Sequence, residues 1–510
     1  MLAYSKSGVV IGIKAFPISI EVDVSPGLPA FNMVGLPEGP VRESRERVKA
    51  AIKNSGYPFP TQKITVNLAP ADIKKEGTGL DLPIAAAILC IAGIIPQERL
   101  DRFCCAGELS LDGTIKPARG ALPIALAARA WPVDGLIIPR ENGSEAAVVK
   151  EVAVHPVGHL ADMVEFLTGQ GDIPRTDVDI QDILGKTRKD QDDFRDIIGQ
   201  EHAKRALEVA AAGAHNVLMT GPPGSGKTML ARRLPSILPP LTFEEALETT
   251  AIYSVAGLLS QDTPLVVERP FCTPHHTISD AGLIGGGTIP KPGQVSLAHN
   301  GVLFLDELPE FRKNVLESLR QPIEDGSVTI SRAAITVSFP ARFTLVAAQN
   351  PCPCGHAGDT AHQCSCTPAQ IQRYRGRISG PLMDRIDIQM EVPAVPYHEL
   401  TESRRGESSE EIAKRVLAAR RVQASRFKNS TIHSNAQMSA RDIDTFCVID
   451  REGRTFLEQV ANKLALSARA FHRIIKIART VADLAGQEYI AIHHLAEAVQ
   501  YRSLDRNTLV

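Results

Sequence analysis

Residues 216–230 read NVLMTGPPGSGKTML, an apolar run followed by a glycine-rich turn and then Lys227 and Thr228. Glycines allow successive backbone N–H groups to curl around a phosphate, and the start of a following helix adds its dipole. Lys227 would contact the β- and γ-phosphates of a nucleotide, and Thr228 would bind Mg²⁺. Because a chance glycine-rich turn rarely stands between a strand and a helix, the pattern predicts a nucleotide site. Its expected lining is Gly221, Pro222, Pro223, Gly224, Ser225, Gly226, Lys227 and Thr228.

An acidic pair follows a second apolar run. In GVLFLDELPEF (301–311), four apolar residues end in Asp306 and Glu307. Asp306 would hold Mg²⁺ through water, and Glu307 would polarise the attacking water, since phosphoryl transfer depends mainly on positioning and electrostatics. Acidic residues after a strand also favour the start of a helix. The phosphate-binding pattern upstream favours the catalytic interpretation here.

Asn350 ends a third apolar run, ARFTLVAAQNP (341–351). In an open α/β sheet, ligands lie at the carboxyl ends of the strands. Asn350 is therefore placed to contact the γ-phosphate or the attacking water. Asparagine is also frequent in turns at strand ends, but the two preceding motifs favour the functional role.

Four cysteines follow in CPCGHAGDTAHQCSC (352–366). Two close Cys-x-Cys pairs suit tetrahedral coordination of Zn²⁺, and a site closed by four cysteines is structural. The alternatives are reduced thiols, disulfides, or a site in which His356 or His362 replaces a cysteine. We expect a structural zinc ion on Cys352, Cys354, Cys364 and Cys366. The other cysteines stand in apolar runs and are expected in the core, namely Cys90, Cys104, Cys105, Cys272 and Cys447.

The elements that position these residues follow from the alternation of apolar strands and helices in 193–395, which predicts an α/β layer domain. Residues 1–170 mix short strand-like runs with Ala-rich helical stretches, and the polar segment 171–192 is expected to be a linker. Residues 396–510 are expected to form a helical lid. Its clearest helical spacing is that of Phe471, Ile474, Ile475, Ala478, Val481 and Ala482.

Composition sets limits on function. With 510 residues and a net charge of −2, the chain can hold several domains, and any nucleic-acid surface must be local. The N-terminus alternates like a strand and lacks the pattern of a signal peptide. Since no apolar run is long enough to span a membrane, we expect a cytoplasmic protein without a membrane partner.

The motifs together resemble those of AAA+ ATPases, including the phosphate loop, the Asp-Glu strand, GPLMDRID (380–387) and the helical lid. The stretch SVTISRAAITVSF (327–339) resembles the branch of AAA+ proteins that includes magnesium chelatase and the MCM helicases. Together with the N-terminal domain, TPHHTISDAGLIGGGTIPKPGQVSLAHNGVLFLDE (273–307) and NPCPCG (350–355) narrow the resemblance to the ComM/YifB family of magnesium-chelatase-like AAA+ ATPases, almost end to end. The resemblance implies ATP and Mg²⁺ as cofactors and hydrolysis of ATP to ADP and phosphate.

The same resemblance implies a ring, expected to be a hexamer. Arg385 matches the arginine finger that reaches a neighbour's nucleotide, and Arg469 in SARAFHR (467–473) matches the lid arginine called sensor 2. On sequence alone, either arginine could instead form a surface ion pair. The family further implies a helicase-like motor for branch migration during natural transformation, with single-stranded and branched or double-stranded DNA as partners.

Residues 327–339 predict a hairpin with its tip around Ser331, Arg332 and Ala333. Related AAA+ rings point this hairpin into the central pore, so one Arg332 per subunit would contact DNA phosphates there. Lys291, in GGGTIPKPGQ (285–294), is a second candidate. Alternatively, Arg332 could pair with a carboxylate.

The N-terminal domain resembles an α+β Lon-protease-like domain of the ribosomal S5 type. The nucleophilic serine of an active Lon domain falls on Gly79 here, and the expected lysine position falls on Leu122-Pro123-Ile124. We therefore expect no peptidase activity. A basic face on the first helix could bind DNA or could be a solvated surface; its members are Arg42, Arg45, Arg47 and Lys49.

Two rival functions follow from the same motifs. The first is an ATPase subunit for metal insertion, since the motor subunit of magnesium chelatase shares this core, but the Lon-like domain disfavours it. The second is an ATP-dependent Lon-like protease, which the missing serine and lysine disfavour.

Overall fold

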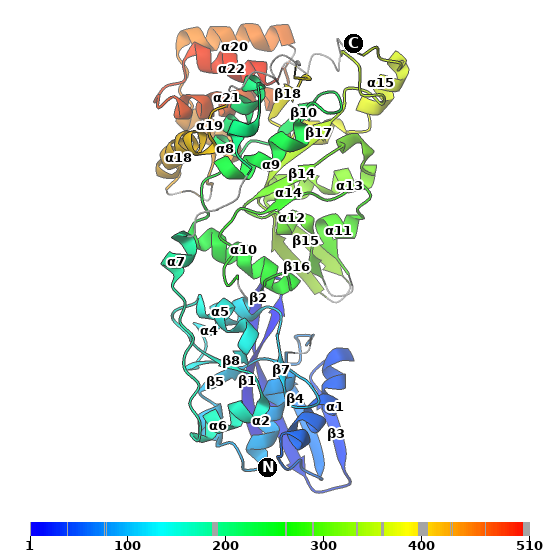
Figure 1. Cartoon of the computed structure of the whole chain (residues 1–510), viewed down its shortest axis with the longest axis vertical. Coiled ribbons are helices and arrows are strands. Elements are labelled where there is room, and N and C mark those ends of the chain that lie inside the picture. The colour runs from blue at the N-terminus through cyan, green and yellow to red at the C-terminus, as the bar shows by residue number, and fades with distance from the viewer. Residues whose placement is uncertain are drawn as a thin grey trace. The chain divides into compact units, whose positions relative to one another are not determined.

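The computed structural model describes residues 2–37, 39–75, 77, 79–185, 192–260, 263–287, 290–332, 335–358, 362–395, 406–428, 430, 432–464 and 466–502. The chain forms two compact units (Figure 1). One comprises Met1–Thr187 with Phe243–Val267, and the other comprises Arg188–Thr242 with Glu268–Val510. None of the described helices has both the length and the apolar character needed to cross a bilayer.

The first unit is built on a mixed seven-stranded sheet with the order β3-β4-β2-β1-β5-β8-β9. Strand β2 pairs antiparallel with β1 and β4, and the other neighbours pair in parallel. Alternate residues of β2 and β4 are buried, as expected for strands with one face in a core. The strands are β1 (Leu2–Ile11), β2 (Lys14–Ser25), β3 (Ala30–Val34), β4 (Lys63–Ala69), β5 (Phe103–Cys105), β8 (Gly135–Pro139) and β9 (Ala153–Val157), with a separate hairpin of β6 (Glu108–Leu109) and β7 (Ile115–Lys116).

Helix α2 (Asp81–Ile91) lies in the centre of this unit, and its residues 81–89 are all buried. Asp81 is the one acidic residue there, and Arg47 of α1 (Gly39–Asn54) donates to it from Nε at 2.6 Å. This ion pair removes Arg47 from the basic surface predicted for α1, a correction that follows from the burial of Asp81. The remaining helices are α3 (Gln97–Leu100), α4 (Ala121–Ala128), η1 (Arg140–Asn142), α5 (Gly143–Ala147), α6 (Leu160–Thr168) and α7 (Ile180–Gly185).

Helix α10 (Phe243–Ala256) also belongs to the first unit, although it lies in the sequence between α9 (Lys227–Ile237) and β11 (Phe271–Cys272) of the second. Its Ala251 joins the apolar cluster that contains Leu122 of α4. Its Ser254 hydroxyl donates to the buried Glu145. Helix α10 therefore lies within the contiguous range 193–395 that the sequence predicted for the α/β domain, although it packs in the first unit.

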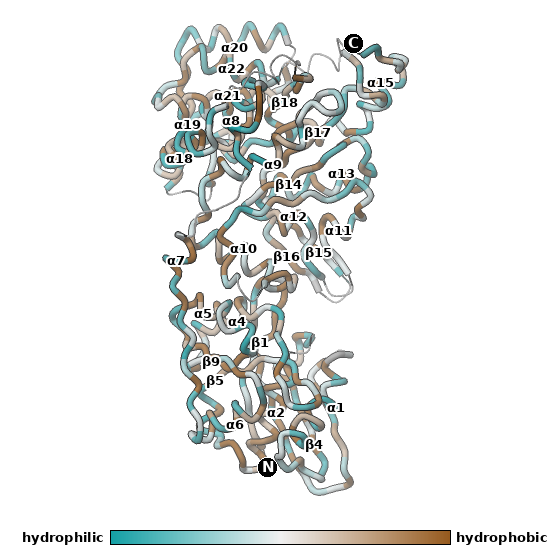
Figure 2. The backbone as a smooth tube through the Cα atoms, viewed as in Figure 1, coloured by the Kyte–Doolittle hydropathy of each residue, from teal (hydrophilic) through white to brown (hydrophobic). Residues whose placement is uncertain are grey.

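The second unit holds a five-stranded parallel sheet with the order β11-β14-β17-β10-β18. The central strands are mainly hydrophobic, which Figure 2 shows around β17, as expected for a parallel sheet covered on both faces. The α/β class predicted from the sequence is confirmed. The strands other than β11 are β10 (Val217–Thr220), β14 (Val302–Leu305), β17 (Thr344–Gln349) and β18 (Ile388–Glu391).

Helices and two hairpins connect these strands. The hairpins are β12 (Gly285–Gly286) with β13 (Lys291–Pro292), and β15 (Ser327–Arg332) with β16 (Ile335–Pro340). The second confirms the predicted hairpin, and Arg332, expected at its tip, is still paired with Ile335 in the ladder. Ala333 lies outside the described residues. The helices are η2 (Phe194–Asp196), α8 (Glu201–Gly213), α9, α11 (Asp280–Ile284), α12 (Gln294–Leu297), η3 (Leu308–Glu310), α13 (Lys313–Ser318), α14 (Arg320–Asp325), α15 (Pro368–Arg375) and α16 (Gly380–Met383).

The C-terminal part of the second unit is helical and shares one apolar core with α8, α9 and the sheet. Helix α21 carries the predicted apolar stripe, which is buried except for the partly exposed Phe471. The buried His215 ring lies 2.8 Å from the Thr480 hydroxyl and ties the end of α8 to α21. The helices are α18 (Ser409–Arg426), η4 (Asn435–Gln437), α19 (Ala440–Phe446), α20 (Arg451–Leu464), α21 (Ala468–Leu484) and α22 (Ile492–Gln500).

Candidate functional site

The phosphate loop, residues 221–226, joins the end of β10 to the start of α9. Gly226 caps α9 with φ +91°, a left-handed conformation that favours glycine. Gly221 lies against the Val392 carbonyl so closely that a Cβ would collide with it. The loop therefore needs glycine at both positions to bring its backbone N–H groups to the start of the helix.

Lys227 is buried at the first turn of α9. Its Nζ donates to the carbonyl oxygens of Gly221 at 2.7 Å and Pro222 at 2.8 Å. The side chain also reaches the Asn350 Oδ1 at 3.3 Å, so two residues predicted separately meet here. Burial lowers the pKa of Lys227, while the charge of Asp306 opposes that shift.

The two predicted magnesium ligands also meet. The Thr228 hydroxyl donates to Asp306 Oδ2 at 2.7 Å, and Asp306 Oδ1 accepts from the Glu307 backbone N–H at 2.9 Å. Strands β14 and β10 both pair in parallel with β17, which aligns their carboxyl ends and explains the convergence. A hydroxyl and a carboxylate are oxygen donors that suit Mg²⁺.

Glu307 leaves β14 with an unusual backbone. Its φ is +52°, and its side chain is 53% exposed. The Glu307 Oε2 lies 3.4 Å from His276 Nδ1. The individual motifs did not indicate this neighbour, although His276 belongs to the TPHH stretch that carries the family resemblance.

The two predicted arginines line one cavity of about 220 Å³ between α14, α16 and α21. Arg385 pairs with Glu324 and donates to the Pro381 carbonyl at 2.5 Å. Its buried Nε has no hydrogen-bond partner among the described residues. Arg469 is 68% exposed and lies 3.8 Å from Asp384. Arg473 and Lys476 of α21 also line this cavity, and burial lowers the pKa of Lys476.

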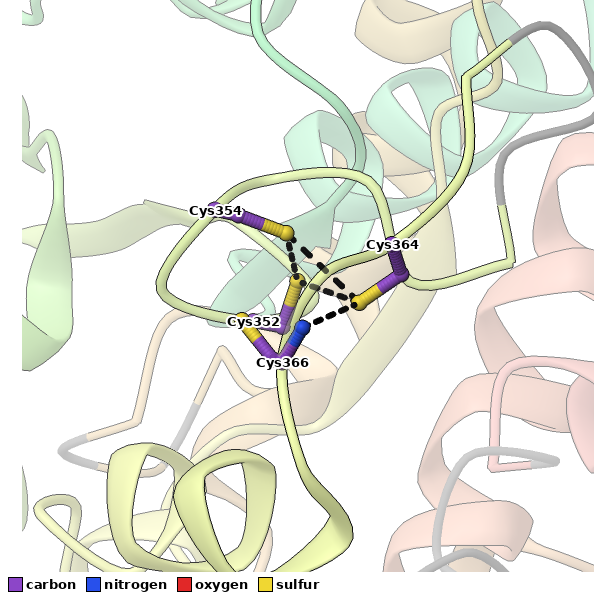
Figure 3. Close-up of side chains that lie close together, drawn as sticks. All are labelled: Cys352, Cys354, Cys364 and Cys366. Atoms are coloured by element: carbon purple, nitrogen blue, oxygen red, sulfur yellow. Dashed lines mark hydrogen bonds between the residues drawn. The ribbon is translucent and has the colours of Figure 1, made fainter.

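The four predicted cysteines converge after β17 (Figure 3). The sulfur of Cys352 lies 3.3 Å from that of Cys354 and 3.7 Å from that of Cys364, and all four sulfurs lie within 4.8 Å of one another. Tetrahedral zinc with Zn–S bonds of about 2.3 Å places its sulfurs roughly 3.8 Å apart. The spacing therefore fits Zn²⁺. His356 and His362 instead lie against each other, with ring centroids 4.9 Å apart.

Backbone N–H groups also point at this cluster. Ala357 N donates to Cys352 Sγ at 3.2 Å, and Cys366 N donates to Cys364 Sγ at 3.4 Å. N–H donors of this kind can accompany cysteine sulfurs that bind a metal. The other cysteines are buried in the core as expected, except for Cys90, which is partly exposed.

The two candidate DNA contacts lie on neighbouring hairpins. Arg332 is exposed at the end of β15, and its Nε donates to the Gly287 carbonyl at 3.4 Å. A Cβ on Gly286 would lie 3.4 Å from the Arg332 Nη2, so β12 and β15 are in contact. Lys291 is exposed at the start of β13. The hairpins thus hold both cations in one region of the second unit.

The first unit has no catalytic side chain at either expected peptidase position. Gly79 only offers its carbonyl to Gly107 N at 2.8 Å. Leu122 is buried, and its N–H donates to Glu145 Oε1 at 3.0 Å. The Glu145 carboxylate thus binds the backbone at the start of α4. The side chains at the expected lysine position are apolar.

Three family models match the chain. Magnesium chelatase, subunit ChlI, matches residues 193–400; subunit ChlI of Mg-chelatase matches 20–142; and the ChlI C-terminal model matches 406–502. Competence protein ComM of Haemophilus influenzae is 45% identical over 509 residues, covering 99% of this chain and 98% of that protein. YifB of Escherichia coli is 44% identical over 497 residues, covering 97% and 96%. Lon protease 2 of Bacillus subtilis is 33% identical over 155 residues, 28% of this chain and 26% of that protein.

Proposed function

Because the chain belongs to the ComM/YifB family of magnesium-chelatase-like AAA+ proteins, we propose that it is a Mg²⁺-dependent ATPase that works as a ring and drives DNA branch migration. The ATPase assignment rests on two contacts at one edge of the sheet. Lys227 contacts Asn350 there, and Thr228 contacts Asp306. Four side chains from three strand ends would then surround the phosphates of one nucleotide.

In this proposal, each residue has a separate task. The phosphate loop binds the nucleotide through backbone N–H groups, and Lys227 moves from its carbonyl partners to the β- and γ-phosphates. Asn350 orients the γ-phosphate or the attacking water, and Glu307 accepts that water's hydrogen bond. Bound Mg²⁺ would neutralise charge on the phosphates, held by Thr228 and Asp306.

We further infer a homo-oligomeric ring from the arginine cavity, and the family resemblance makes a hexamer the expected size. Neither Lys227 nor Thr228 is part of its lining, whereas Arg385, Arg469 and Arg473 are. The buried Arg385 Nε is left without a partner among the described residues. A phosphate of a nucleotide bound to another copy would satisfy that donor and several positive charges at once. Arg469 would thus act with Arg385.

The DNA assignment rests on the family and on the two hairpins. The Haemophilus influenzae relative carries the name competence protein, which agrees with a role in natural transformation and recombination. Arg332 and Lys291 supply exposed cations on a chain whose net charge is −2, and phosphate contacts account for most non-specific affinity for DNA. Single-stranded and branched DNA are the proposed tracks.

We also assign a structural zinc ion to Cys352, Cys354, Cys364 and Cys366. Their sulfur spacing and N–H···S bonds support this ligand set over His356 or His362. Zinc would stabilise the loop that follows Asn350 and would take no part in hydrolysis.

The proposed function can be tested with a three-strand branched DNA substrate. Purified protein should displace the labelled strand only with ATP and Mg²⁺, and Lys227→Ala should leave it paired. A metal-insertion subunit is the alternative that the chelatase model for 193–400 favours. ATP hydrolysis without displacement of the labelled strand would support that alternative.

A further inference from the structure

Asn216 stands directly before β10, the strand that lies between β17 and β18. Its half-buried side chain binds on both sides of β10. The amide Nδ2 donates to the Arg385 carbonyl at 2.9 Å, and Oδ1 accepts from the Leu345 N–H at 2.8 Å. Because asparagine carries a donor and an acceptor on one side chain, it can hold both neighbours at once.

The backbone of Asn216 also binds the segment that carries Arg385. Its carbonyl accepts from the N–H groups of Asp387 at 3.0 Å and Ile388 at 2.9 Å, and its own N–H donates to Asp387 Oδ2 at 3.1 Å. Strand β18 begins only at Ile388, where its pairing with β10 starts opposite Val217. The Nδ2 bond therefore extends the attachment to Arg385, before the strand begins.

The next carbonyl of this segment is held by two other side chains. Ile386 O accepts from Arg502 Nη1 at 2.7 Å and from Arg473 Nη1 of α21 at 3.3 Å. The carbonyls of residues 385 and 386 are thus both fixed by side chains, although neither residue lies in a strand. Arg385, with 9% of its side chain exposed, extends from this fixed backbone into the arginine cavity.

We propose that Asn216 is a positioning residue that sets the place of Arg385 in the cavity, an inference that rests on the proposed action of Arg385 on a neighbour's nucleotide. The guanidinium bonds to Glu324 and to the Pro381 carbonyl of its own subunit. A phosphate that draws it away from these partners leaves the backbone as its remaining support. Without the Nδ2 bond, the Arg385 carbonyl is released, and the guanidinium meets the phosphate in a poorer position.

Strand β10 provides a second route from Asn216 to catalysis. It ends at Thr220, where the phosphate loop follows, so a disturbed strand would impair the nucleotide site of its own subunit. The hydrogen bonds favour the route through Arg385, since Nδ2 and the backbone bind the segment 385–388 whereas Oδ1 binds β17. The two routes act in different subunits, and mixtures of variants distinguish them.

Two substitutions of Asn216 test its side-chain bonds separately. Asn216→Ala removes both. At pH 8, Asn216→Asp keeps an acceptor for the Leu345 N–H but, as a carboxylate, donates nothing to the Arg385 carbonyl. Asn54→Asp is the matched control, since the Asn54 side chain also donates to a carbonyl, that of Leu111, at 2.7 Å in the first unit. Thermal melting shows which variants fold, and either folded Asn216 variant carries the test.

We expect kcat to fall about tenfold in both Asn216 variants, because misplacing a catalytic group by about 1 Å can cost on the order of 100-fold. The affinity for a fluorescent ATP analogue should stay unchanged, and Asn54→Asp should keep the wild-type kcat. A one-to-one mixture of Asn216→Ala with Lys227→Ala should regain activity, because some interfaces join an intact phosphate loop to a correctly placed Arg385. A mixture of Asn216→Ala with Arg385→Ala should regain none.

The reverse pattern would overturn the inference. Activity regained with Arg385→Ala but not with Lys227→Ala would mean that Asn216 acts on the phosphate loop of its own subunit. A normal kcat in Asn216→Asp beside a lowered kcat in Asn216→Ala would also contradict it, because the bond to Leu345 would then be the one that matters. An unchanged kcat in both variants would exclude any positioning role.

Failure of the proposed ring looks different, since Arg385→Ala and Lys227→Ala would then not complement each other. A chain that carries both Asn216→Ala and Arg385→Ala still tests the role of Asn216 in that case. It should hydrolyse ATP no more slowly than Arg385→Ala alone, because two residues that act through one group do not have additive effects. A further loss of activity in the double variant would contradict the inference.

Discussion

Pro223 of the phosphate loop packs against Gly355 of the cysteine loop, so closely that a Cβ on Gly355 would lie 2.6 Å from the proline Cδ. Gly355 has φ +88° and sits between Cys354 and the remaining ligands of the proposed zinc site. On the same side, Asn350 contacts Lys227 two residues before Cys352. The cysteine loop therefore supports the nucleotide site at two points.

This contact makes Gly355→Ala informative. The added methyl group must displace Pro223, and we expect ATP affinity to fall about tenfold, or roughly 1.4 kcal/mol, the lower range of overpacking costs. Zinc content should stay the same. Gly358→Ala is a matched control, since Gly358 also has a positive φ of +81° but has open space around its Cβ position. Equal losses of affinity in both variants would rule out the Pro223 contact as the cause.

The zinc assignment predicts one zinc ion per chain. Elemental analysis after dialysis should give a ratio near one, and replacing Cys354 and Cys366 with Ser should lower it to near zero. The same double substitution should reduce ATPase activity through Asn350 while leaving the chain folded. A wild-type ratio near zero would refute the assignment.

Substitutions of Lys227 and Glu307 should impair different steps of the ATPase reaction. Lys227→Ala should lose nucleotide binding, because the charge that contacts the phosphates is gone. Glu307→Gln should bind ATP, hydrolyse it at least 100-fold more slowly, on the order of the loss of one catalytic group, and stabilise the ring. Binding assays with a fluorescent ATP analogue and size measurements would separate the two. Normal hydrolysis by Glu307→Gln would remove Glu307 from its proposed role.

The arginine cavity predicts complementation between subunits. Arg385→Ala should bind ATP but hydrolyse it slowly, and Lys227→Ala should be inactive. A one-to-one mixture should regain part of the activity, because some interfaces join an intact phosphate loop to an intact Arg385. Arg377→Ala, which removes an ion pair with Glu310 outside the cavity, is a control that should change little. If the mixture is no more active than its components, Arg385 does not act on the nucleotide of a neighbouring subunit. It would then act on the nucleotide of its own subunit or take no part in catalysis.

Much of the site was predictable because its residues follow buried strands directly or through the phosphate loop. Asp306 and Asn350 each follow an apolar run, Lys227 follows the loop after a third, and a parallel sheet aligns such strand ends without further information. The contacts of Gly355 with Pro223 and of His276 with Glu307 were not predictable, since they join loops whose paths depend on packing. Likewise, nothing in the local pattern of α10 indicated that it packs in the first unit.

The pattern of charges along the sequence predicted the positions of arginine side chains less well. Arg47 shares a helix with other basic residues, yet it turns inward because Asp81 is buried and needs a partner. Arg469 and Arg385 were assigned separate tasks by family pattern, and the structure places them on one cavity. In both cases, a carboxylate or a cavity far away in sequence decides where the guanidinium lies.

DNA-dependent ATP hydrolysis tests the central claim most directly. The rate would be measured with Mg²⁺ alone, with single-stranded DNA and with branched DNA, for the wild type and for Arg332→Ala. We expect DNA to raise the wild-type rate several-fold, and Arg332→Ala to lose most of that increase while keeping its DNA-free rate and its assembly. A wild-type rate that neither form of DNA changes would contradict a DNA motor.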